Sequence, residues 1–304
     1  MVGLVVALAF LYATAALAAT AYSLRELPGR LGRLLHYAKE ASSEEQAVTV
    51  ADIGCDHGLL SLALCESIKH SHIYATDQSA GSKEKVNALV AASAVDCIEA
   101  RRRITVLTGD GLEPLLQHGC KADVLVLAGM GVRSIVNILS RNTATDVGIG
   151  EGVVDFSSLD TLGVREIIVQ PWPEHYLLQH HLYKLMLSHG YCYSDQSVDT
   201  TSRGQKKSFY YITTRFTKRV GSACSNSAMG GAAPDDLSTQ RQSPLYTKLV
   251  RGLLQPRERE AYLSYLRKQR RTVASRRAGL AGGGEWLAAL DGLIEEQLLT
   301  GGDF

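Results

Sequence analysis

The sequence predicts an α/β fold with a doubly wound, Rossmann-like sheet of seven mostly parallel strands. From residue 47 onward, short apolar runs alternate with segments that have helical periodicity. Several of these runs end directly in an acidic residue or a glycine, as strands that lead into a ligand site do. The chain has 304 residues, of which 45% are hydrophobic and 21% charged, so it is long enough for one large domain with an appendage.

Seven runs have the length and composition of strands. The first five are predominantly apolar and are separated by helix-forming segments, which favours a parallel arrangement. The last two are expected to form a β-hairpin at an edge of the sheet. In chain order, the runs are Ala47–Ile53, His72–Thr76, Ile104–Thr108, Val124–Ala128, Glu166–Gln170, Tyr191–Tyr193 and Phe209–Thr214.

Helical periodicity follows most of these strands. In Gly58–Lys69 the apolar residues recur three and four positions apart, as on one face of an α-helix. Before the first strand, leucines and arginines interleave in Ser23–Leu35, which predicts a basic amphipathic helix belonging to the folded domain. The other expected helices are Lys83–Ala94, a segment through Ile135, Ile138 and Leu139, and His175–His189.

The N-terminal segment lies outside the alternating pattern. Residues 1–22 resemble a signal or targeting segment, because Leu4–Ala19 is almost wholly apolar and Ala16-Leu17-Ala18 resembles a cleavage site. This apolar stretch is short for a membrane span, so we expect no stable span in the mature protein. The main domain is expected over residues 23–220, with Asn142–Leu162 as a surface loop.

A linker and a basic helical extension are expected to follow the domain. Residues 221–243 are rich in Gly, Ser and Ala, which is typical of a flexible linker, and residues 244–304 are expected to be helical and coiled-coil-like. Between Leu245 and Leu280, ten Lys or Arg stand against two Glu, a net charge of +8, whereas the whole chain carries only +1. Such a segment suits the phosphates of RNA or forms a solvated helical face. Its apolar side is expected from Tyr262, Leu263, Tyr265 and Leu266.

The first strand leads into a turn of acids and glycines, Asp52-Ile53-Gly54-Cys55-Asp56-His57-Gly58. A strand that ends in glycine and turns into a helix places backbone N–H groups at a ligand site, and Gly54 and Gly58 allow close approach. The three-glycine dinucleotide fingerprint and the Lys-Ser/Thr of a phosphate loop are both missing. A glycine-punctuated turn without any ligand is the alternative interpretation.

Acids and glycines also follow the next three strands, and the carboxyl ends of parallel strands meet at one edge of a sheet. There, Asp77 can accept both hydroxyls of a ribose, Asp110 can accept the exocyclic amine of adenine, and Asp52 can hold an ammonium group. This combination predicts S-adenosylmethionine (SAM) as the cofactor. Taken singly, Asp77 is also a helix N-cap candidate and Asp110 a turn former. The predicted cofactor-binding residues are Asp52, Gly54, Gly58, Asp77, Gly109, Asp110, Gly111, Gly129 and Met130.

No metal site is expected from the cysteines. The six cysteines are scattered along the chain without a Cys-x-x-Cys pair, which argues against structural zinc.

Four motifs carry a family resemblance: Asp52 to Gly58, Gly109-Asp110-Gly111-Leu112-Glu113, Ala128-Gly129-Met130-Gly131 and Ile168-Val169-Gln170-Pro171. With these motifs in this order, the chain resembles the bacterial tRNA (adenine(22)-N(1))-methyltransferase family, the TrmK-like proteins, from about Leu24 to Ala278. The resemblance implies a class I SAM-dependent methyltransferase (EC 2.1.1) that acts on N1 of adenine 22 in tRNA. The Asp56-His57 pair and the Ala-Gly-Met-Gly turn are its most specific features.

The chain also departs from the family pattern. Leu59-Leu60-Ser61 stands where the family usually has an aromatic residue and a proline, and Val132 replaces a glycine. Asp77 replaces the more common glutamate, which is chemically equivalent. Trp172 replaces an asparagine that would lie where the target base enters, so this departure bears most directly on the substrate.

Adenine N1 lies on the Watson–Crick edge, so the target base has to be unpaired or flipped. A carboxylate such as Asp56 near the methylated N1 would stabilise its positive charge, and a neutral His57 would accept a proton. Alternatively, Asp56 binds the methionine ammonium, and His57 packs on the cofactor or bonds the turn. Gln170 contacts the adenine edge or satisfies the backbone, and Trp172 stacks on the base or packs within a turn. The predicted catalytic residues are Asp56, His57, Gln170 and Trp172.

The expected partner is tRNA, bound through the basic C-terminal helices. Two other classes of function are compatible with the motifs: a SAM-dependent methyltransferase for another RNA, a protein or a small molecule, and a non-catalytic SAM- or RNA-binding module. A tRNA substrate combined with a signal-like N-terminus suggests an organelle with its own tRNAs, such as a plastid or a mitochondrion, with the cytoplasm as the alternative.

Overall fold

The computed structural model describes residues 27, 29–42, 46–93, 97–140, 155–173, 176–203, 207–219, 254, 256–276, 287–288, 290–292 and 294–295. The signal-like segment 1–22, the linker 221–243 and much of the extension 244–304 therefore lie outside the described residues. The chain divides into an N-terminal unit (residues 1–128, 137–143 and 153–168) and a C-terminal unit (residues 129–136, 144–152 and 169–304).

Seven strands form one sheet in the order β3-β2-β1-β4-β5-β7-β6, which confirms the predicted fold class. Strand β1 pairs in parallel with β2 and β4, β2 pairs in parallel with β3, and β6 pairs antiparallel with β7. The strand order reverses between β1 and β4, which is the position where doubly wound sheets bind ligands. The strands are β1 (Thr49–Ile53), β2 (His72–Asp77), β3 (Ile104–Thr108), β4 (Val124–Ala128), β5 (Glu166–Gln170), β6 (Tyr191–Arg203) and β7 (Lys207–Lys218).

The helices also follow the predicted alternation. The segment expected as a basic amphipathic helix forms α2 over residues 29–40, and its buried face includes Leu34, Leu35 and Tyr37. The helices are α2 (Gly29–Glu40), α3 (Leu59–Ser67), α4 (Ala80–Ala92), α5 (Cys97–Arg103), α6 (Glu113–Gln117), α7 (Val132–Ser140), α8 (Ser157–Leu162), α9 (Tyr176–Ser188) and α12 (Pro256–Arg276). Within the part of the chain that is described, no helix is long and apolar enough to cross a membrane.

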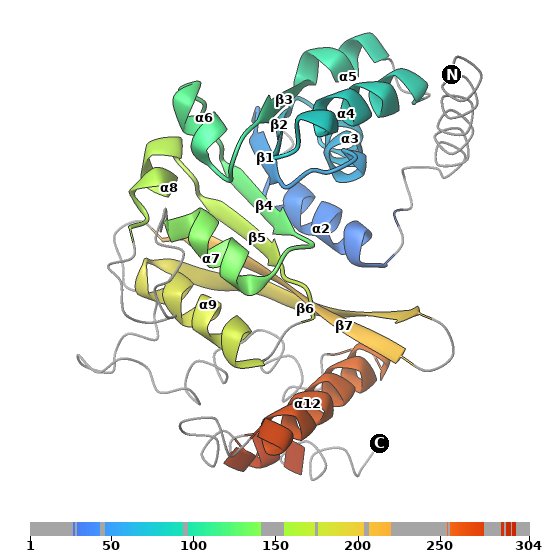
Figure 1. Ribbon diagram of the computed structural model, residues 1–304, viewed down its shortest axis with the longest axis vertical. Helices are drawn as coiled ribbons and strands as arrows, with labels where there is room; N and C mark the ends of the chain where they lie inside the picture. The colour runs from blue at the N-terminus through green and yellow to red at the C-terminus, as the bar shows by residue number, and fades with distance from the viewer. Residues whose placement is uncertain are drawn as a thin grey trace, which may run out of the picture. The chain divides into compact units, whose positions relative to one another are not determined.

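In the N-terminal unit, helices α2, α3 and α4 cover one face of the parallel strands, while α6 and α8 lie on the other side (Figure 1). The main core lies between α2–α4 and the sheet. It includes Leu34, Leu62, Ile73, Val86 and Val124, all of which are almost completely buried. Burying this apolar face is what fixes the strand ends, and thus the turns that follow them, in one arrangement.

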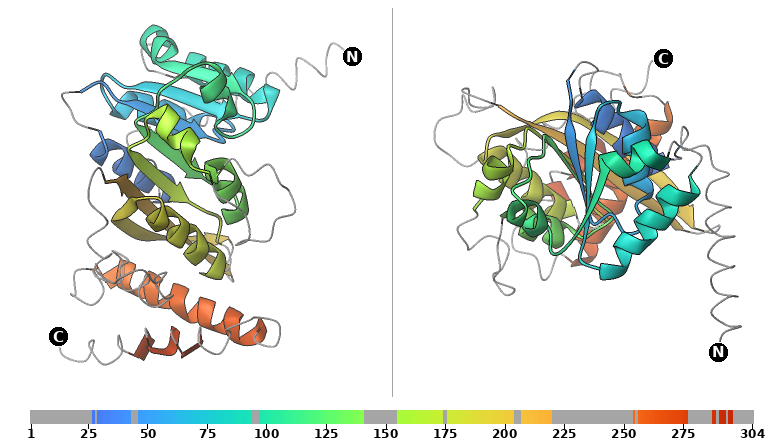
Figure 2. Two further views of the ribbon diagram at one scale, coloured as in Figure 1. Left: turned by 90° about the vertical axis from the view of Figure 1, so that its left-hand side faces the viewer. Right: turned by 90° about the horizontal axis from the view of Figure 1, so that it is seen from above.

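The C-terminal unit is built on the long β6–β7 hairpin. Helix α12, orange in Figure 2, lies along the hairpin and contacts β6. Its Tyr262, Tyr265 and Leu266 are buried in a small core with Val198 and Ile212 of the hairpin. The predicted apolar side of the basic segment is thus the face that packs on the sheet.

Two expectations from the sequence are wrong in detail. The segment Asn142–Leu162 is not a loop throughout, because its end forms α8, where Leu159 and Leu162 are buried and Asp155 accepts the Ser157 N–H at 2.8 Å. The hairpin strands are also much longer than their apolar centres suggested. Backbone pairing continues from Tyr191 opposite Lys218 to Arg203 opposite Lys207, because an antiparallel ladder extends through polar residues as well, and some of these, such as Gln196 and Thr214, are buried and bonded to each other.

Candidate functional site

The turn after β1 has an unusual backbone. Gly54, Asp56 and Gly58 all have positive φ angles, of 79°, 48° and 75°. The turn is held because the N–H groups of Gly54 and Cys55 both donate to the Thr76 carbonyl, at 2.8 and 2.9 Å. At Gly58 a Cβ atom would lie 2.6 Å from a methyl group of Val86, so only glycine fits there. The turn therefore brings its backbone against the end of β2 and the start of α4.

Asp77 at the end of β2 fixes this turn. Its Oδ2 accepts the N–H of Asp56 at 3.0 Å, and its Oδ1 accepts the N–H of Ser79 at 2.8 Å, just before α4. The N-cap of α4 is Ser79, so Asp77 does not cap the helix but closes an Asx-turn in front of it. A carboxylate has about four acceptor sites, so Asp77 keeps acceptor capacity for a ligand hydroxyl.

Asp52, the last acid of β1, is only 4% exposed. Its Oδ2 accepts a hydrogen bond from the Ser61 hydroxyl at 2.6 Å. Burial raises the pKa of the Asp52 carboxyl to about 6, and the nearby negative charge of Asp77 adds to this effect. Burial and the same two carboxylates raise the pKa of the Cys55 thiol to about 12, so Cys55 is a neutral, unreactive thiol.

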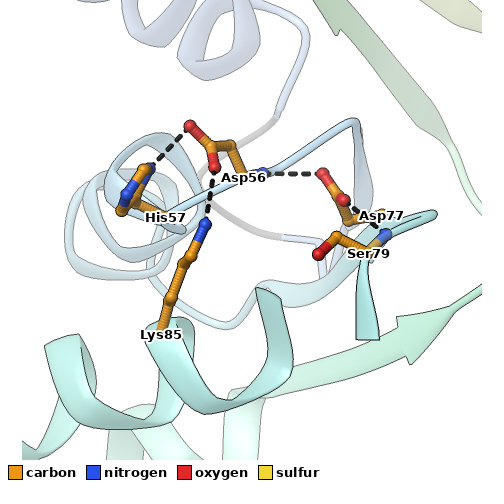
Figure 3. A network of polar contacts seen from close by, with 5 residues as sticks. All are labelled: Asp56, His57, Asp77, Ser79 and Lys85. Carbon is orange, nitrogen blue, oxygen red and sulfur yellow. Dashed lines mark hydrogen bonds and ion pairs between the residues drawn. The ribbon is translucent and has the colours of Figure 1, made fainter. Parts of the chain in front are cut away.

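The side chains of Asp56 and His57 are exposed on the turn, at 65% and 62% (Figure 3). The Asp56 Oδ2 lies 2.6 Å from His57 Nδ1, and its Oδ1 lies 3.3 Å from Lys85 Nζ of α4. Partial burial opposes ionisation of Asp56, but the hydrogen bonds from His57 and Lys85 outweigh it and lower the pKa of this carboxyl. The turn thus presents an ionised carboxylate and an imidazole to solvent.

Beyond β3, the Gly109-Asp110-Gly111 turn carries an exposed acid. The Asp110 carbonyl accepts the Glu113 N–H at 3.0 Å, which closes the turn into α6. Its Oδ1 accepts the side-chain amide of Gln78 at 2.5 Å, so the ends of β2 and β3 are joined. The N–H of Gly109 donates to the Asp77 carbonyl at 3.0 Å, which brings these predicted residues together.

The residues at the ends of β1, β2 and β3 fit SAM. Asp52 and Asp77 stand near the ends of β1 and β2, and Asp110 lies in the turn after β3, so the three acids follow three neighbouring parallel strands. The Asp52 and Asp77 carboxylates repel each other, and this repulsion adds to the effect of burial in raising the pKa of Asp52. An excess of negative charge suits a ligand that carries an ammonium and a sulfonium, and acceptor oxygens suit its ribose and adenine amine.

In the C-terminal unit, the turns after β4 and β5 are joined to each other. The Gly129 N–H donates to the Gln170 carbonyl at 3.1 Å, and the Trp172 N–H donates to the Met130 carbonyl at 2.9 Å. The Trp172 side chain is 58% exposed, and among the described residues no other large hydrophobic side chain is exposed. Its indole is therefore exposed, which disfavours the alternative from the sequence that it packs within the turn.

Gln170 requires a correction. It was expected to contact a substrate base, but it is completely buried and its amide donates to the Thr213 hydroxyl of β7 at 2.6 Å. Nearby, the Gln196 amide donates to the Thr214 hydroxyl at 3.0 Å, and Thr214 lies 3.2 Å from the Tyr183 hydroxyl. Gln170 therefore bonds across the sheet from β5 to β7, because an amide buried in a sheet has to be satisfied there. The Gln196–Thr214–Tyr183 contacts, which join the hairpin to α9, are a separate set, since Thr213 and Thr214 are successive strand residues and point to opposite faces.

Three residues of the site were not found from the sequence. Lys85 was not identified because a lysine on an amphipathic helix is normally a solvated charge. Ser61 could have been noticed, because it lies in the segment where the chain departs from the TrmK-like pattern. Its hydroxyl, in the first turn of α3 and nine residues after Asp52, bonds that acid. Gln78 directly follows Asp77 and its partner lies 32 residues away, so only the fold shows the contact.

The chain is similar to one protein family and to several solved structures. The model of a family described as a methyltransferase domain matches residues 32–195, which is more than half of the chain. No match was found among curated proteins.

Several solved structures resemble the chain. TrmK of M. capricolum, in complex with S-adenosylhomocysteine, is 16% identical with a TM-score of 0.51, and the match covers 88% of this chain and 96% of that one. A candidate tRNA (m1A22) methyltransferase of Streptococcus pneumoniae is 17% identical with a TM-score of 0.56, covering 86% and 98%. A Streptococcus agalactiae protein of the NADB-Rossmann superfamily is 13% identical with a TM-score of 0.55, covering 90% and 96%. At these identities the likeness shows the fold.

Proposed function

Because this chain belongs to the methyltransferase domain family, we propose that it transfers a methyl group from SAM to N1 of an adenine in tRNA, at position 22. The use of SAM follows from the family and the fold. The tRNA substrate is supported by the motifs shared with the TrmK-like proteins and by the fold of the S. pneumoniae protein. The observation that carries the choice of adenine chemistry is the exposed Asp56–His57 pair on the first turn.

The acids of the first three strands bind the cofactor in this proposal. Asp77 and Asp110 accept hydrogen bonds from its ribose hydroxyls and adenine amine, and Gly54, which has no side chain, leaves the backbone open to it, whereas Gly58 makes room for Val86 of α4. Asp52, buried beneath the turn, adds negative charge that favours a cationic ligand. Bound SAM supplies a methyl group on a positively charged sulfur.

The Asp56–His57 pair acts on the target base. Adenine N1 attacks the methyl carbon with its lone pair, the carbon–sulfur bond breaks, and its electron pair stays on sulfur. The methylated ring then carries a positive charge, which the ionised Asp56 stabilises. His57 accepts a proton from the exocyclic amine as the N1–carbon bond forms, so it acts in the methyl-transfer step itself and the product leaves as the neutral imine. The side chains of Asp56 and His57 are not needed to hold the turn, because the turn is held by backbone N–H groups that donate to Thr76 and Asp77.

Two further surfaces would hold the RNA. The exposed Trp172 of the C-terminal unit gives an unpaired base of the RNA an aromatic face for stacking. Along α12, Arg257, Arg267 and Arg271 are exposed, while the tyrosines of the same helix face the hairpin core. Arginines on the solvent face of a helix suit the phosphates of a folded RNA.

The test is a methylation assay with the full chain. Unmodified tRNA transcripts are incubated with methyl-labelled SAM, digested, and analysed for 1-methyladenosine, and a reverse-transcription stop locates the modified base. We expect 1-methyladenosine at position 22 and none in a transcript with guanine at that position. Asp110→Ala should bind SAM at least ten times more weakly by calorimetry.

Two results would overturn the proposal. One is tight SAM binding without methylation of any tRNA, which would favour a different substrate. The other is methylation at N6 rather than N1 of adenine, which would leave no purpose for a charge-stabilising carboxylate at the ring nitrogen. Charge reversal at Arg267 and Arg271 should raise KM for tRNA without affecting SAM binding.

A further inference from the structure

The Asp56 carboxylate is shared between two cationic or proton-donating groups that come from different elements. Its Oδ2 is 2.6 Å from His57 Nδ1 on the same turn, and its Oδ1 is 3.3 Å from Lys85 Nζ on α4 (Figure 3). Lys85 is the less exposed partner, at 32% of its side chain. Each carboxylate oxygen therefore has a defined role, and the plane of the carboxylate is fixed from two directions.

This arrangement determines the state of the His57 ring. An ionised carboxylate only accepts hydrogen bonds, so the short contact at Nδ1 requires the proton to be on Nδ1. In the neutral ring, Nε2 then carries the lone pair. A neutral His57 in this tautomer accepts a proton at Nε2, which is what removal of a proton from an exocyclic amine requires.

A carboxylate alone beside an imidazole would also favour the charged imidazolium, which has no lone pair to offer. The ammonium of Lys85 opposes this effect because its positive charge lies against the same carboxylate. We propose that Lys85 is a positioning residue for the Asp56–His57 pair: it holds the carboxylate in place and offsets part of its charge, so that His57 keeps its proton on Nδ1 and Nε2 as the proton acceptor. This inference rests on the proposed function, because Nε2 needs a substrate proton to accept.

The other charged groups around the pair do not replace Lys85. Asp77 at the end of β2 contacts the turn through the Asp56 N–H, and Asp52 of β1 is buried below it. Both are acidic, so they favour the imidazolium. Among the described residues of these elements, Lys85 is the cation in contact with Asp56, and the neighbouring Lys83 is exposed on the same helix.

The experiment compares the pH dependence of kcat/KM for tRNA in wild type, Lys85→Met and Lys85→Arg, with Lys83→Met as the matched control. Removing the Lys85 charge should move the acidic limb of the profile to higher pH by about half a pH unit. The loss of kcat/KM is then about threefold near pH 6 and negligible near pH 9. Lys85→Arg should restore the wild-type profile, and Lys83→Met should leave it unchanged.

A residue that only supports the fold would lower kcat/KM equally at every pH, and this result would overturn the proposal. An equal shift in Lys83→Met would also overturn it, because it would show a general effect of net charge. SAM affinity, measured by calorimetry, should be the same in all four proteins.

A second readout does not depend on activity. The ¹⁵N chemical shifts of the His57 ring, assigned with His57→Gln, report which nitrogen carries the proton. We expect the Nδ1–H form in the neutral wild-type ring and, in Lys85→Met, protonation of the ring at a pH about half a unit higher. A neutral ring with its proton on Nε2 would overturn the inference. If the ring behaves as expected but no tRNA is methylated, the proposed function fails while the positioning by Lys85 stands.

Discussion

The first turn of the N-terminal unit and the hairpin of the C-terminal unit both contain networks of polar side chains, but of opposite kinds. Around Asp56, the network is charged and exposed, and its carboxylate and imidazole still have acceptor capacity. In the hairpin, the polar contacts are neutral and buried: Gln170 bonds Thr213, and Gln196 bonds Thr214, which contacts Tyr183. Burial raises the pKa of the Tyr183 hydroxyl to about 12, so this group remains neutral at any physiological pH.

The difference in burial between the two regions shows two uses of polar side chains, one for binding a ligand and one for fixing the fold. An exposed, charged network has little influence on folding because water can replace its contacts, so its positions are free to serve a ligand. A buried network has to be satisfied within the protein, so each member specifies how strands and helices pair. The predictions that follow treat the first as functional and the second as structural.

The largest expected effect is on catalysis. His57→Gln should lower kcat for tRNA methylation about 1000-fold, equivalent to about 4 kcal/mol, because the proton acceptor is removed. Its free energy of unfolding should change little, since the side chain is exposed. Single-turnover methylation and urea denaturation measure the two quantities. If His57→Gln lowered the free energy of unfolding but left kcat unchanged, His57 would be a structural residue and not a catalytic one.

The next effect is on stability. Gln170→Ala should lower the free energy of unfolding by about 3 kcal/mol, because it creates a cavity and leaves the buried Thr213 hydroxyl without its partner. Gln170→Met fills the volume without the hydrogen bond and should recover part of the loss. Denaturant unfolding of both variants provides the measurement. Normal stability with abolished methylation would instead return Gln170 to the substrate site.

Asp52 combines features of both networks, since it is charged and buried. Its folded-state pKa of about 6 lies above its ordinary value of 3.8, so the folded protein binds the proton more tightly. Its contribution therefore lowers stability as the pH rises from about 4 to 6, and this loss persists above pH 6. Asp52→Asn keeps an acceptor for Ser61 and should be about 3 kcal/mol more stable at pH 7.

The pH dependence gives the control for this prediction. The difference in stability between Asp52→Asn and wild type should disappear below about pH 3, where the wild-type carboxyl is protonated in both the folded and the unfolded state. Thermal or urea unfolding across this range is the measurement. A difference that does not depend on pH would show that the substitution acts through packing rather than charge.

The smallest expected effect belongs to Trp172. Trp172→Ala should raise KM for tRNA about tenfold, or about 1.4 kcal/mol, through loss of base stacking. Its free energy of unfolding should stay within about 0.5 kcal/mol of wild type, because the indole is more than half exposed. Trp172→Phe, which retains an aromatic face, should be intermediate. A loss of stability without a change in KM would assign Trp172 to packing.

Several features could be predicted because they depend on local sequence. The strand limits at Ile104–Thr108, Val124–Ala128 and Glu166–Gln170 match the structure, since short apolar runs between glycines and acids form buried strands. The helix α8 and the full length of β6 and β7 were not predicted. Their polar residues are paired or partly buried only because distant segments lie against them.

The sequence alone determined the fold class, the order of the turns and the chemistry that they carry, because apolar periodicity and the Asp, Gly and His positions are local properties. The tertiary structure decided which of these side chains are available. It buried Asp52 and Gln170, left His57 and Trp172 exposed, and placed Lys85 of α4 against Asp56, 29 residues earlier. Burial and contacts between distant residues arise only when the elements pack, so no local pattern contains them.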